Sequence, residues 1–143
     1  MTSYFLDTSA LVKHYRIEAG SERIDALFAD PDSDILISEL GIVEFASTFQ
    51  RLKNRREIDD DAFSRALDRF TFDTTHRMTV LEFRSDSIKL ARELVLQRSL
   101  RTLDALQLAC ALSAKSDDLV FASADANLLT AAQTNALQVL SPL

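Results

Sequence analysis

The sequence predicts an α/β fold in which helices cover both faces of a parallel β-sheet. Short apolar runs of strand length alternate with longer segments of helical periodicity, the pattern of parallel strands joined by helices. Glycine and proline are scarce, with two of each in 143 residues, so most of the chain should lie in regular elements joined by short turns. This length suits a single domain spanning 1–143 and leaves no room for a second independent core.

In the first half of the chain, turn and capping residues indicate where helices begin. Ser21, after Gly20, is the predicted N-cap of a helix that Pro31 stops, and the acids after Asp59 complement the dipole of another helix. The predicted strands are Tyr4–Leu6 and Ile35–Ile37; the predicted helices begin within Ala10–Tyr15, at Ser21, at about Glu39 (running to Asn54) and at Asp59, the last with Phe63, Ala66, Leu67 and Phe70 facing inward.

The second half repeats the alternation. One helix carries Ile88, Ala91, Leu94 and Val95 on a single face, whereas the next is apolar nearly all round. The predicted order is a strand at Thr79–Leu81, the helix containing Ile88, a helix at Thr102–Lys115, a strand at Leu119–Ala122, a helix from about Ala124 to Thr134, and a final run at Leu137–Leu140.

Composition excludes several classes of protein. The net charge of −6 argues against coating nucleic acid by bulk electrostatics, but not against an enzyme that meets a phosphodiester locally. His14 and His76 have no partner at metal-ligand spacing, and the lone Cys110 cannot form an internal disulfide. No apolar run approaches the roughly 20 residues that span a bilayer, and the N-terminus lacks a basic region. We therefore expect a cytoplasmic protein without a membrane partner.

Two acids come directly after predicted strands. Asp7 closes the first strand, and Asp125 lies three residues after the strand that ends at Ala122. In open parallel sheets, ligand sites lie beyond the carboxyl ends of the strands. Each acid also has a purely structural interpretation: Asp7 can cap a helix, and Asp125 can complement a helix dipole.

Two further acids lie in apolar helices. Asp104 has Leu108 and Leu112 one and two turns later, so its charge would be buried and would need a partner. That partner is either a metal ion, which we favour, or Arg101 one turn earlier. Glu44 has apolar neighbours, although a position on the helix surface is the alternative.

Carboxylates that converge above the sheet require a counter-charge. At about 4 Å and an effective dielectric near 20, each pair repels by roughly 4 kcal/mol. Oxygen-only ligands favour Mg²⁺ or Mn²⁺ over zinc. Such ions activate water and neutralise phosphoryl oxygens, so the spacing indicates metal-dependent phosphoryl transfer or hydrolysis.

Four candidate motifs follow one another along the chain: Asp7–Lys13, Ile42–Phe45, Leu100–Ala109 and Phe121–Leu128. In this order they resemble motifs of the PIN-domain family, especially the VapC toxins of toxin–antitoxin pairs. The segment Leu100–Ala109 is the most specific match, and the resemblance covers nearly the whole chain.

The resemblance implies a PIN fold with a central parallel sheet of about five strands. It further implies endonucleolytic cleavage of RNA with Mg²⁺ or Mn²⁺, neutralisation by a VapB-like antitoxin, and a homodimer. Carried over residue by residue, it gives the catalytic and metal-binding acids Asp7, Glu44, Asp104 and Asp125. Thr8, Ser9 and Ser123 are candidate hydroxyl helpers, although helix capping explains them equally well. Histidine is frequent in the family where this chain has Gln107, and no ligand role depends on that position.

The densest group of basic residues lies at the end of the helix that carries Glu44. As a group they are the best candidates for contacts with RNA phosphates, whereas helix-dipole complementation and solubility explain at least half of them. These residues are Arg51, Lys53, Arg55 and Arg56.

Four alternatives compete with a toxin nuclease. A haloacid-dehalogenase-like phosphatase needs a second aspartate two residues after the first, where this chain has Ser9, and a receiver domain needs an acidic pair that is absent. A PIN-domain RNA-processing nuclease without an antitoxin remains open. So does a PIN module that binds RNA or a partner without cleaving, although the presence of all four acids counts against it.

Overall fold

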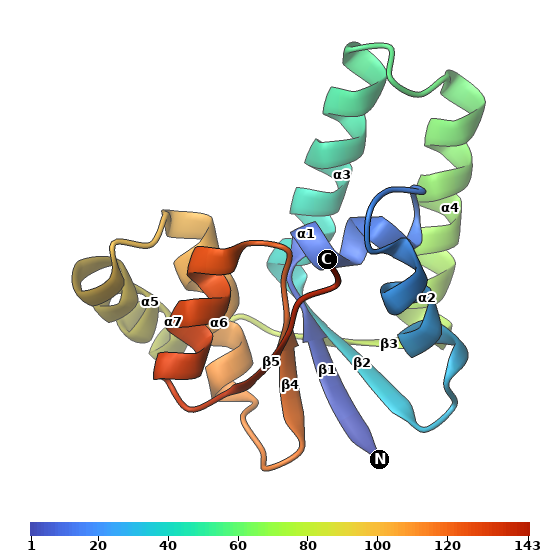
Figure 1. The fold of residues 1–143 in the computed structure, drawn as a ribbon. Helices are drawn as coiled ribbons and strands as arrows, with labels where there is room; N and C mark the ends of the chain where they lie inside the picture. Colours follow the sequence, from blue (N-terminus) through green and yellow to red (C-terminus); the bar gives the residue numbers. More distant parts are fainter.

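The computed structural model describes residues 1–143 and contains one five-stranded sheet in which every pairing is parallel. The strand order is β3-β2-β1-β4-β5, with β1 in the centre (Figure 1). This confirms the predicted α/β fold with a parallel sheet of about five strands. The strands are β1 (Thr2–Leu6), β2 (Ser33–Ser38), β3 (Met78–Leu81), β4 (Leu119–Ala122) and β5 (Gln138–Leu140).

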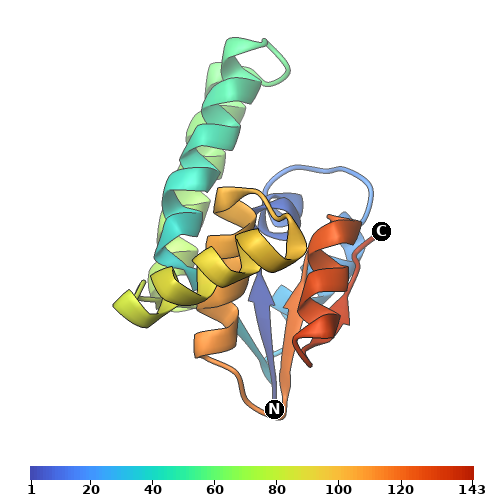
Figure 2. The ribbon, with the colours of Figure 1, turned by 90° about the vertical axis from the view of Figure 1, so that its left-hand side faces the viewer.

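Helices lie on both faces of the sheet, as the alternating pattern predicts. One group packs on one face of the sheet, and the other group, which follows β3 in the chain, packs on the opposite face (Figures 1 and 2). The first group is α1 (Thr8–Leu11), the 3-10 turn η1 (Val12–His14), α2 (Ser21–Ala29), α3 (Glu39–Asn54) and α4 (Asp60–His76); the second is α5 (Ser85–Arg98), α6 (Thr102–Ser113) and α7 (Ala126–Thr134).

The sheet separates two hydrophobic cores. Because successive strand residues face opposite ways, Phe5 enters the core under α5, α6 and α7, whereas Leu6 enters the core under α1 to α4. Phe5 stacks on Phe121 of the neighbouring strand with ring centroids 5.6 Å apart. In the other core, Phe45 of α3 stacks on Phe70 of α4 at 4.0 Å. This second contact joins α3 to α4 at the sheet.

The strand order places a switch point at the centre of the sheet. The chain moves outward from β1 through β2 to β3, then crosses to β4 and β5 on the other side of β1. Loops leaving β1 and β4 therefore diverge to opposite faces. The divergence leaves a crevice at the carboxyl ends of these strands, and open α/β sheets bind ligands in crevices of this kind.

Side-chain caps fix the starts of the helices around this crevice. Asp7 accepts a hydrogen bond from the Ala10 amide at the start of α1, and Asp125 accepts from two amides of α7. Ser38 and Asp59 cap α3 and α4 in the same way. The prediction for α2 was wrong: its N-cap is Gly20, at φ 90°, which L side chains rarely adopt.

The hydroxyl predicted to cap α2 has another use. Ser21 is the first residue of α2, and its hydroxyl accepts from the Glu18 amide and donates to the Arg16 carbonyl. It therefore closes the preceding loop.

The helices α3 and α4 form a hairpin whose far half extends beyond the sheet (Figures 1 and 2). None of the helices is both long enough and apolar enough to cross a membrane.

Arg77 ties the hairpin back to the sheet. After the last turn of α4, its guanidinium donates to the carbonyls of Leu27, Phe28 and Asp30 at the end of α2 and of Ser33 at the start of β2, all within 2.9–3.0 Å. Four acceptors in different directions suit a planar fork of donors and not a single ammonium group. Arg77 thus anchors the strand that leads into α3.

We therefore expect Arg77→Lys to lower the free energy of unfolding by about 1–3 kcal/mol, since a lysine leaves some of these carbonyls unpaired. Urea unfolding measures the change. Arg84→Lys is the matched control, because Arg84 is exposed and its side chain makes no hydrogen bond or ion pair. Equal stability of the two variants would show that the guanidinium contacts contribute nothing.

Candidate active site

The four acids singled out in the sequence line one cavity of about 270 Å³ at the carboxyl edge of the sheet. It lies where α1, α3 and α6 meet, beside the loop from β4 to α7. Residues 7, 44, 104 and 125 come from four separate segments of the chain, and the fold brings all of them to this cavity. The lining residues are Asp7, Thr8, Ser9, Val12, Glu44, Thr48, Arg51, Arg101, Asp104, Gln107 and Asp125.

Asp7 is the most deeply buried of the four, with 4% of its surface exposed. One carboxylate oxygen accepts from the Ser9 hydroxyl at 2.7 Å and from the Ala10 amide at 3.0 Å. The other accepts from the Ser123 hydroxyl at 2.6 Å, across the switch point between β1 and β4. The capping role considered for Asp7 is therefore real, and the predicted helpers Ser9 and Ser123 both bind this carboxylate.

Burial raises the pKa of the Asp7 carboxyl to about 6. The hydrogen bonds from Ser123, Ser9 and Ala10 stabilise the ionised form and oppose this shift, whereas the negative charge of Asp104 adds to it. The main cause of the raised pKa is therefore loss of solvent, and the like charge of Asp104 is a smaller contribution.

Arg101 bridges two of the acids at the rim of the cavity. Its Nε lies 3.3 Å from Asp104 Oδ2, and its Nη2 lies 3.8 Å from Asp125 Oδ2. The ion pair weighed as the alternative for Asp104 therefore exists. Asp104 is not fully buried as expected, however, because its side chain is 23% exposed. The side chain of Arg101 is 83% exposed. Asp104 faces the cavity and not the core, so a solvent-screened arginine satisfies it only weakly.

Glu44 projects from α3 toward the same cavity and is only partly buried. The amide of Gln107 on α6 donates to its carboxylate at 2.6 Å. Burial raises the pKa of Glu44, hydrogen bonds from Gln107 and Thr8 lower it, the charge of Asp104 raises it, and the charge of Arg51 lowers it. The negative charge of Asp104 therefore raises the pKa of both Glu44 and Asp7, so these three acids are coupled electrostatically.

The acids offer the type of ligand atom that a hard divalent cation prefers, but the distances between them do not yet form a metal site. All the acids present oxygen, the ligand that Mg²⁺ and Mn²⁺ prefer, and each carboxylate has lone pairs beyond those that accept the hydrogen bonds described. No three His, Cys, Asp or Glu side chains stand close enough together to hold a metal ion as they are. A cation would have to draw the carboxylates inward and displace Arg101 from Asp104 and Asp125.

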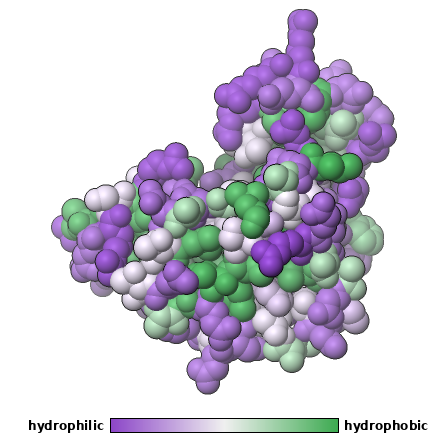
Figure 3. Space-filling view, viewed as in Figure 1, coloured by the Kyte–Doolittle hydropathy of each residue, from purple (hydrophilic) through white to green (hydrophobic).

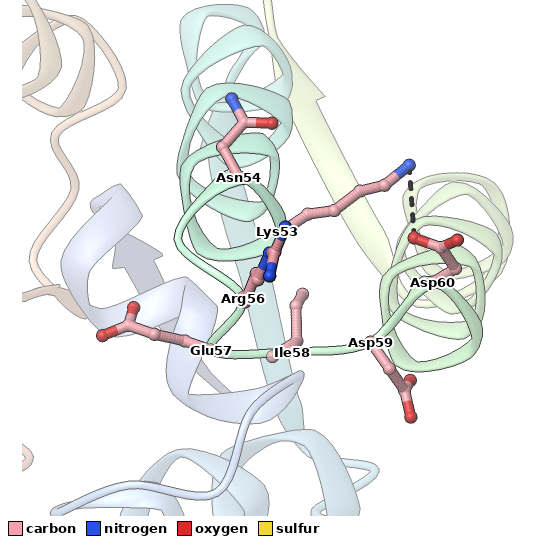
Figure 4. A pocket seen from close by; sticks show the side chains of 7 residues that line it. All are labelled: Lys53, Asn54, Arg56, Glu57, Ile58, Asp59 and Asp60. Atoms are coloured by element: carbon pink, nitrogen blue, oxygen red, sulfur yellow. Dashed lines mark ion pairs between the residues drawn. The ribbon is translucent and has the colours of Figure 1, made fainter.

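The basic group at the end of α3 divides into two parts. Arg51 lines the acidic cavity, where its guanidinium donates to the hydroxyls of Ser47 and Thr48. Lys53 and Arg56 instead line a separate cavity at the tip of the α3–α4 hairpin, where Lys53 lies 3.7 Å from Asp60 (Figure 4). The surface of the tip is largely hydrophilic (Figure 3). Proximity in sequence therefore does not make the four one patch at the site.

Two residues of the cavity were underestimated from the sequence. Gln107 had no assigned role, and Thr48 was not singled out, yet both line the cavity. The available signal for Gln107 was its position three residues after Asp104 in a helix that is otherwise apolar, since a buried amide needs partners. For Thr48, the spacing of one helical turn from Glu44 was the only indication.

Solved structures with this fold include PAE2754 from Pyrobaculum aerophilum, which aligns with a TM-score of 0.68 at 20% identity over 99% of this chain and 90% of that one. VapBC2 from Rickettsia felis, bound to a DNA fragment from its promoter, aligns at 0.66 with 15% identity, covering 97% and 98%. Mycobacterium tuberculosis VapC20, described as a sarcin-ricin loop cleaving toxin, aligns at 0.68 with 16% identity, covering 90% and 94%.

No sequence among the curated proteins matches this chain. The model of the PIN domain family, in contrast, matches residues 4–133. This span contains β2, β3, β4, most of β1 and all four acids of the cavity, and it ends before β5. The resemblance found in the four sequence motifs is thereby confirmed, and the chain belongs to the PIN domain family.

Proposed function

We propose that this protein is a Mg²⁺- or Mn²⁺-dependent endoribonuclease and the toxin component of a toxin–antitoxin pair. The observation that carries the proposal is the meeting of Asp7, Glu44, Asp104 and Asp125 in one cavity at the switch point of the sheet. Their oxygen-only chemistry is the kind that a hard divalent cation prefers. Burial raises the pKa of both Asp7 and Glu44, so their negative charges lack full compensation within the protein.

In this proposal the four carboxylates hold the cation, which supplies an activated water and neutralises charge on the phosphoryl group. Ser9 and Ser123 orient Asp7 through bonds of 2.7 and 2.6 Å, and Thr8 contributes to the hydrogen bonding around Glu44. Arg51, held by Ser47 and Thr48, presents a positive charge beside the acids and binds a phosphate of the RNA.

The antitoxin and the homodimer are also proposed for this chain. Support comes from the fold shared with VapBC2 of Rickettsia felis, a complex bound to promoter DNA, together with the sequence resemblance to VapC toxins. One observation favours the alternative of a PIN module that does not cleave: Arg101 already provides a positive charge to Asp104 and Asp125. RNA cleavage by the purified protein with Mn²⁺, and its loss with EDTA, separates the two.

The first test removes one carboxylate. Asp104→Asn should reduce Mn²⁺-dependent RNA cleavage by more than about 100-fold, the upper end of what a supporting contact to a metal ligand costs, while leaving the fold intact. Asp68→Asn, an exposed aspartate on α4 without side-chain partners, is the matched control and should cleave normally. A folded Asp104→Asn protein with wild-type cleavage would contradict the site assignment.

The second test separates the two parts of the basic group. Arg51→Gln should weaken RNA binding, lower the salt slope by about one, and slow cleavage even at saturating RNA, because the lost contact lies at the acids. Replacing Lys53, Arg55 and Arg56 by Gln should flatten the salt dependence of binding but leave the rate at saturation unchanged. Unchanged salt slopes in both variants would show that RNA binds elsewhere.

A further inference from the structure

Gln107 is a buried amide in the wall of the acidic cavity, with 2% of its surface exposed. Its side chain makes three hydrogen bonds, each to a different segment. Nε2 donates to Glu44 Oε1 of α3 at 2.6 Å and to Thr8 Oγ1 of α1 at 3.2 Å, and Oε1 accepts from Ser38 Oγ at 3.0 Å. Each side-chain N–H and the carbonyl oxygen of this amide therefore has a partner.

The orientation of the amide follows from the hydrogen-bond network. The hydroxyl of Ser38, the last residue of β2, accepts from the Gly41 amide at 3.2 Å, which leaves its own proton free to donate to the carbonyl of Gln107. A flipped amide would place its NH₂ group where Ser38 donates and its oxygen against the Glu44 carboxylate. The Ser38 hydroxyl thus forces the Gln107 donors to face Glu44.

Glu44 lacks the backbone donors that hold Asp7 and Asp125. Asp7 is held by three donors and Asp125 by two backbone amides, but Glu44 sits in the middle of a helix and has no backbone donor. Its flexible side chain follows the exposed residues Ile42 and Val43. The bond from Gln107 fixes one carboxylate oxygen of Glu44, a residue that lines the cavity.

We propose that Gln107 is a positioning residue that holds Glu44 in the orientation needed to bind the divalent cation. This inference rests on the proposed function, because it concerns the same carboxylates. The competing interpretation is structural: Gln107 joins α6 to β2 and α1, and any effect on the site comes from movement of α6, which also carries Asp104. The two interpretations differ in whether the effect of Gln107 passes through Glu44.

A double-mutant cycle with Mn²⁺ as the probe distinguishes them. Gln107→Met keeps the length of the side chain but removes the donors, and should weaken Mn²⁺ binding by about 10–100-fold, as loss of a supporting contact to a metal ligand does. In a Glu44→Gln background the same substitution should have no further effect. Binding to all four proteins is measured by titration of free Mn²⁺ and checked by the Mn²⁺-induced rise in Tm.

Ser87→Ala is the matched structural control, because it removes a buried hydroxyl contact between α5 and α6 (Ser87 to Ser113, 2.8 Å) outside the cavity. It should lower stability without changing Mn²⁺ affinity. If Gln107→Met does not fold, Gln107→Asn, which keeps an amide but is one methylene too short to reach Glu44, takes its place.

Each outcome of these Mn²⁺ titrations supports or contradicts the positioning role of Gln107. Wild-type affinity in Gln107→Met, or an equal loss with and without the Glu44 carboxylate, would overturn the positioning role while leaving the proposed nuclease intact. Unchanged affinity in Glu44→Gln would remove Glu44 from the metal site, and absence of Mn²⁺ binding by the wild type would overturn the proposed function itself.

Discussion

The structure depends on one buried negative charge at the centre of the sheet. Asp7 follows the central strand, and its carboxylate accepts from Ser123 at the end of β4 while capping α1. Ser9 extends the link, since its hydroxyl donates to Asp7 and accepts from the Ala124 amide. These bonds link the ends of β1 and β4, two neighbouring strands whose following helices lie on opposite faces of the sheet. The same bonds hold an anion where solvent cannot compensate it, so the fold and the charge of the cavity have one origin.

The remaining acids are arranged around this charge with different partial counter-charges. Arg101 lies between Asp104 and Asp125 from an exposed position, where screening limits each contact to less than about 1 kcal/mol. Gln107 supplies a neutral donor to Glu44, which stabilises the carboxylate without removing its charge. These contacts therefore compensate the acids only in part, which is consistent with the cation site that we propose.

The sequence was sufficient for the fold class and for the segments that meet at the cavity, because both follow from patterns along the chain. Alternation of strands and helices defines the parallel sheet, and acids placed just after strands must reach its carboxyl edge. Contacts across the molecule were not predictable in this way. That Arg101 would bridge Asp125 as well as Asp104, or that Gln107 would reach Ser38 and Thr8, depends on side-chain geometry between segments far apart in sequence.

Predictions from local sequence patterns also failed where two structural roles competed for the same residues. Ser21 has the chemistry of an N-cap, but Gly20 takes that place because the backbone there adopts a positive φ, and the serine hydroxyl satisfies the preceding loop. The basic residues 51 to 56 look like one cluster in the sequence. The helix ends among them, however, and directs Arg51 to the cavity and Lys53 to the hairpin tip.

The central claim, that Asp7 and its neighbours store unfavourable charge that a cation relieves, is tested most directly by the stability of Asp7→Asn. The folded-state pKa of Asp7, about 6, exceeds the unfolded value of 3.8, so ionisation destabilises the fold fully above pH 6 and not at all below about pH 4. Asn caps nearly as well as Asp and carries no charge, although it replaces the bonds from Ser9 and Ser123 imperfectly.

Thermal and urea unfolding of both proteins, in EDTA at pH 4 and pH 7 and with Mn²⁺ at pH 7, gives the comparison. We expect the variant in EDTA at pH 7 to be as stable as the wild type or more stable, by on the order of 1 kcal/mol, and this advantage to vanish at pH 4. We also expect Mn²⁺ to stabilise the wild type much more than the variant. A strongly destabilised variant in EDTA at pH 7, or equal stabilisation of both proteins by Mn²⁺, would mean that Asp7 acts only as a structural cap and that the four acids do not form one metal site.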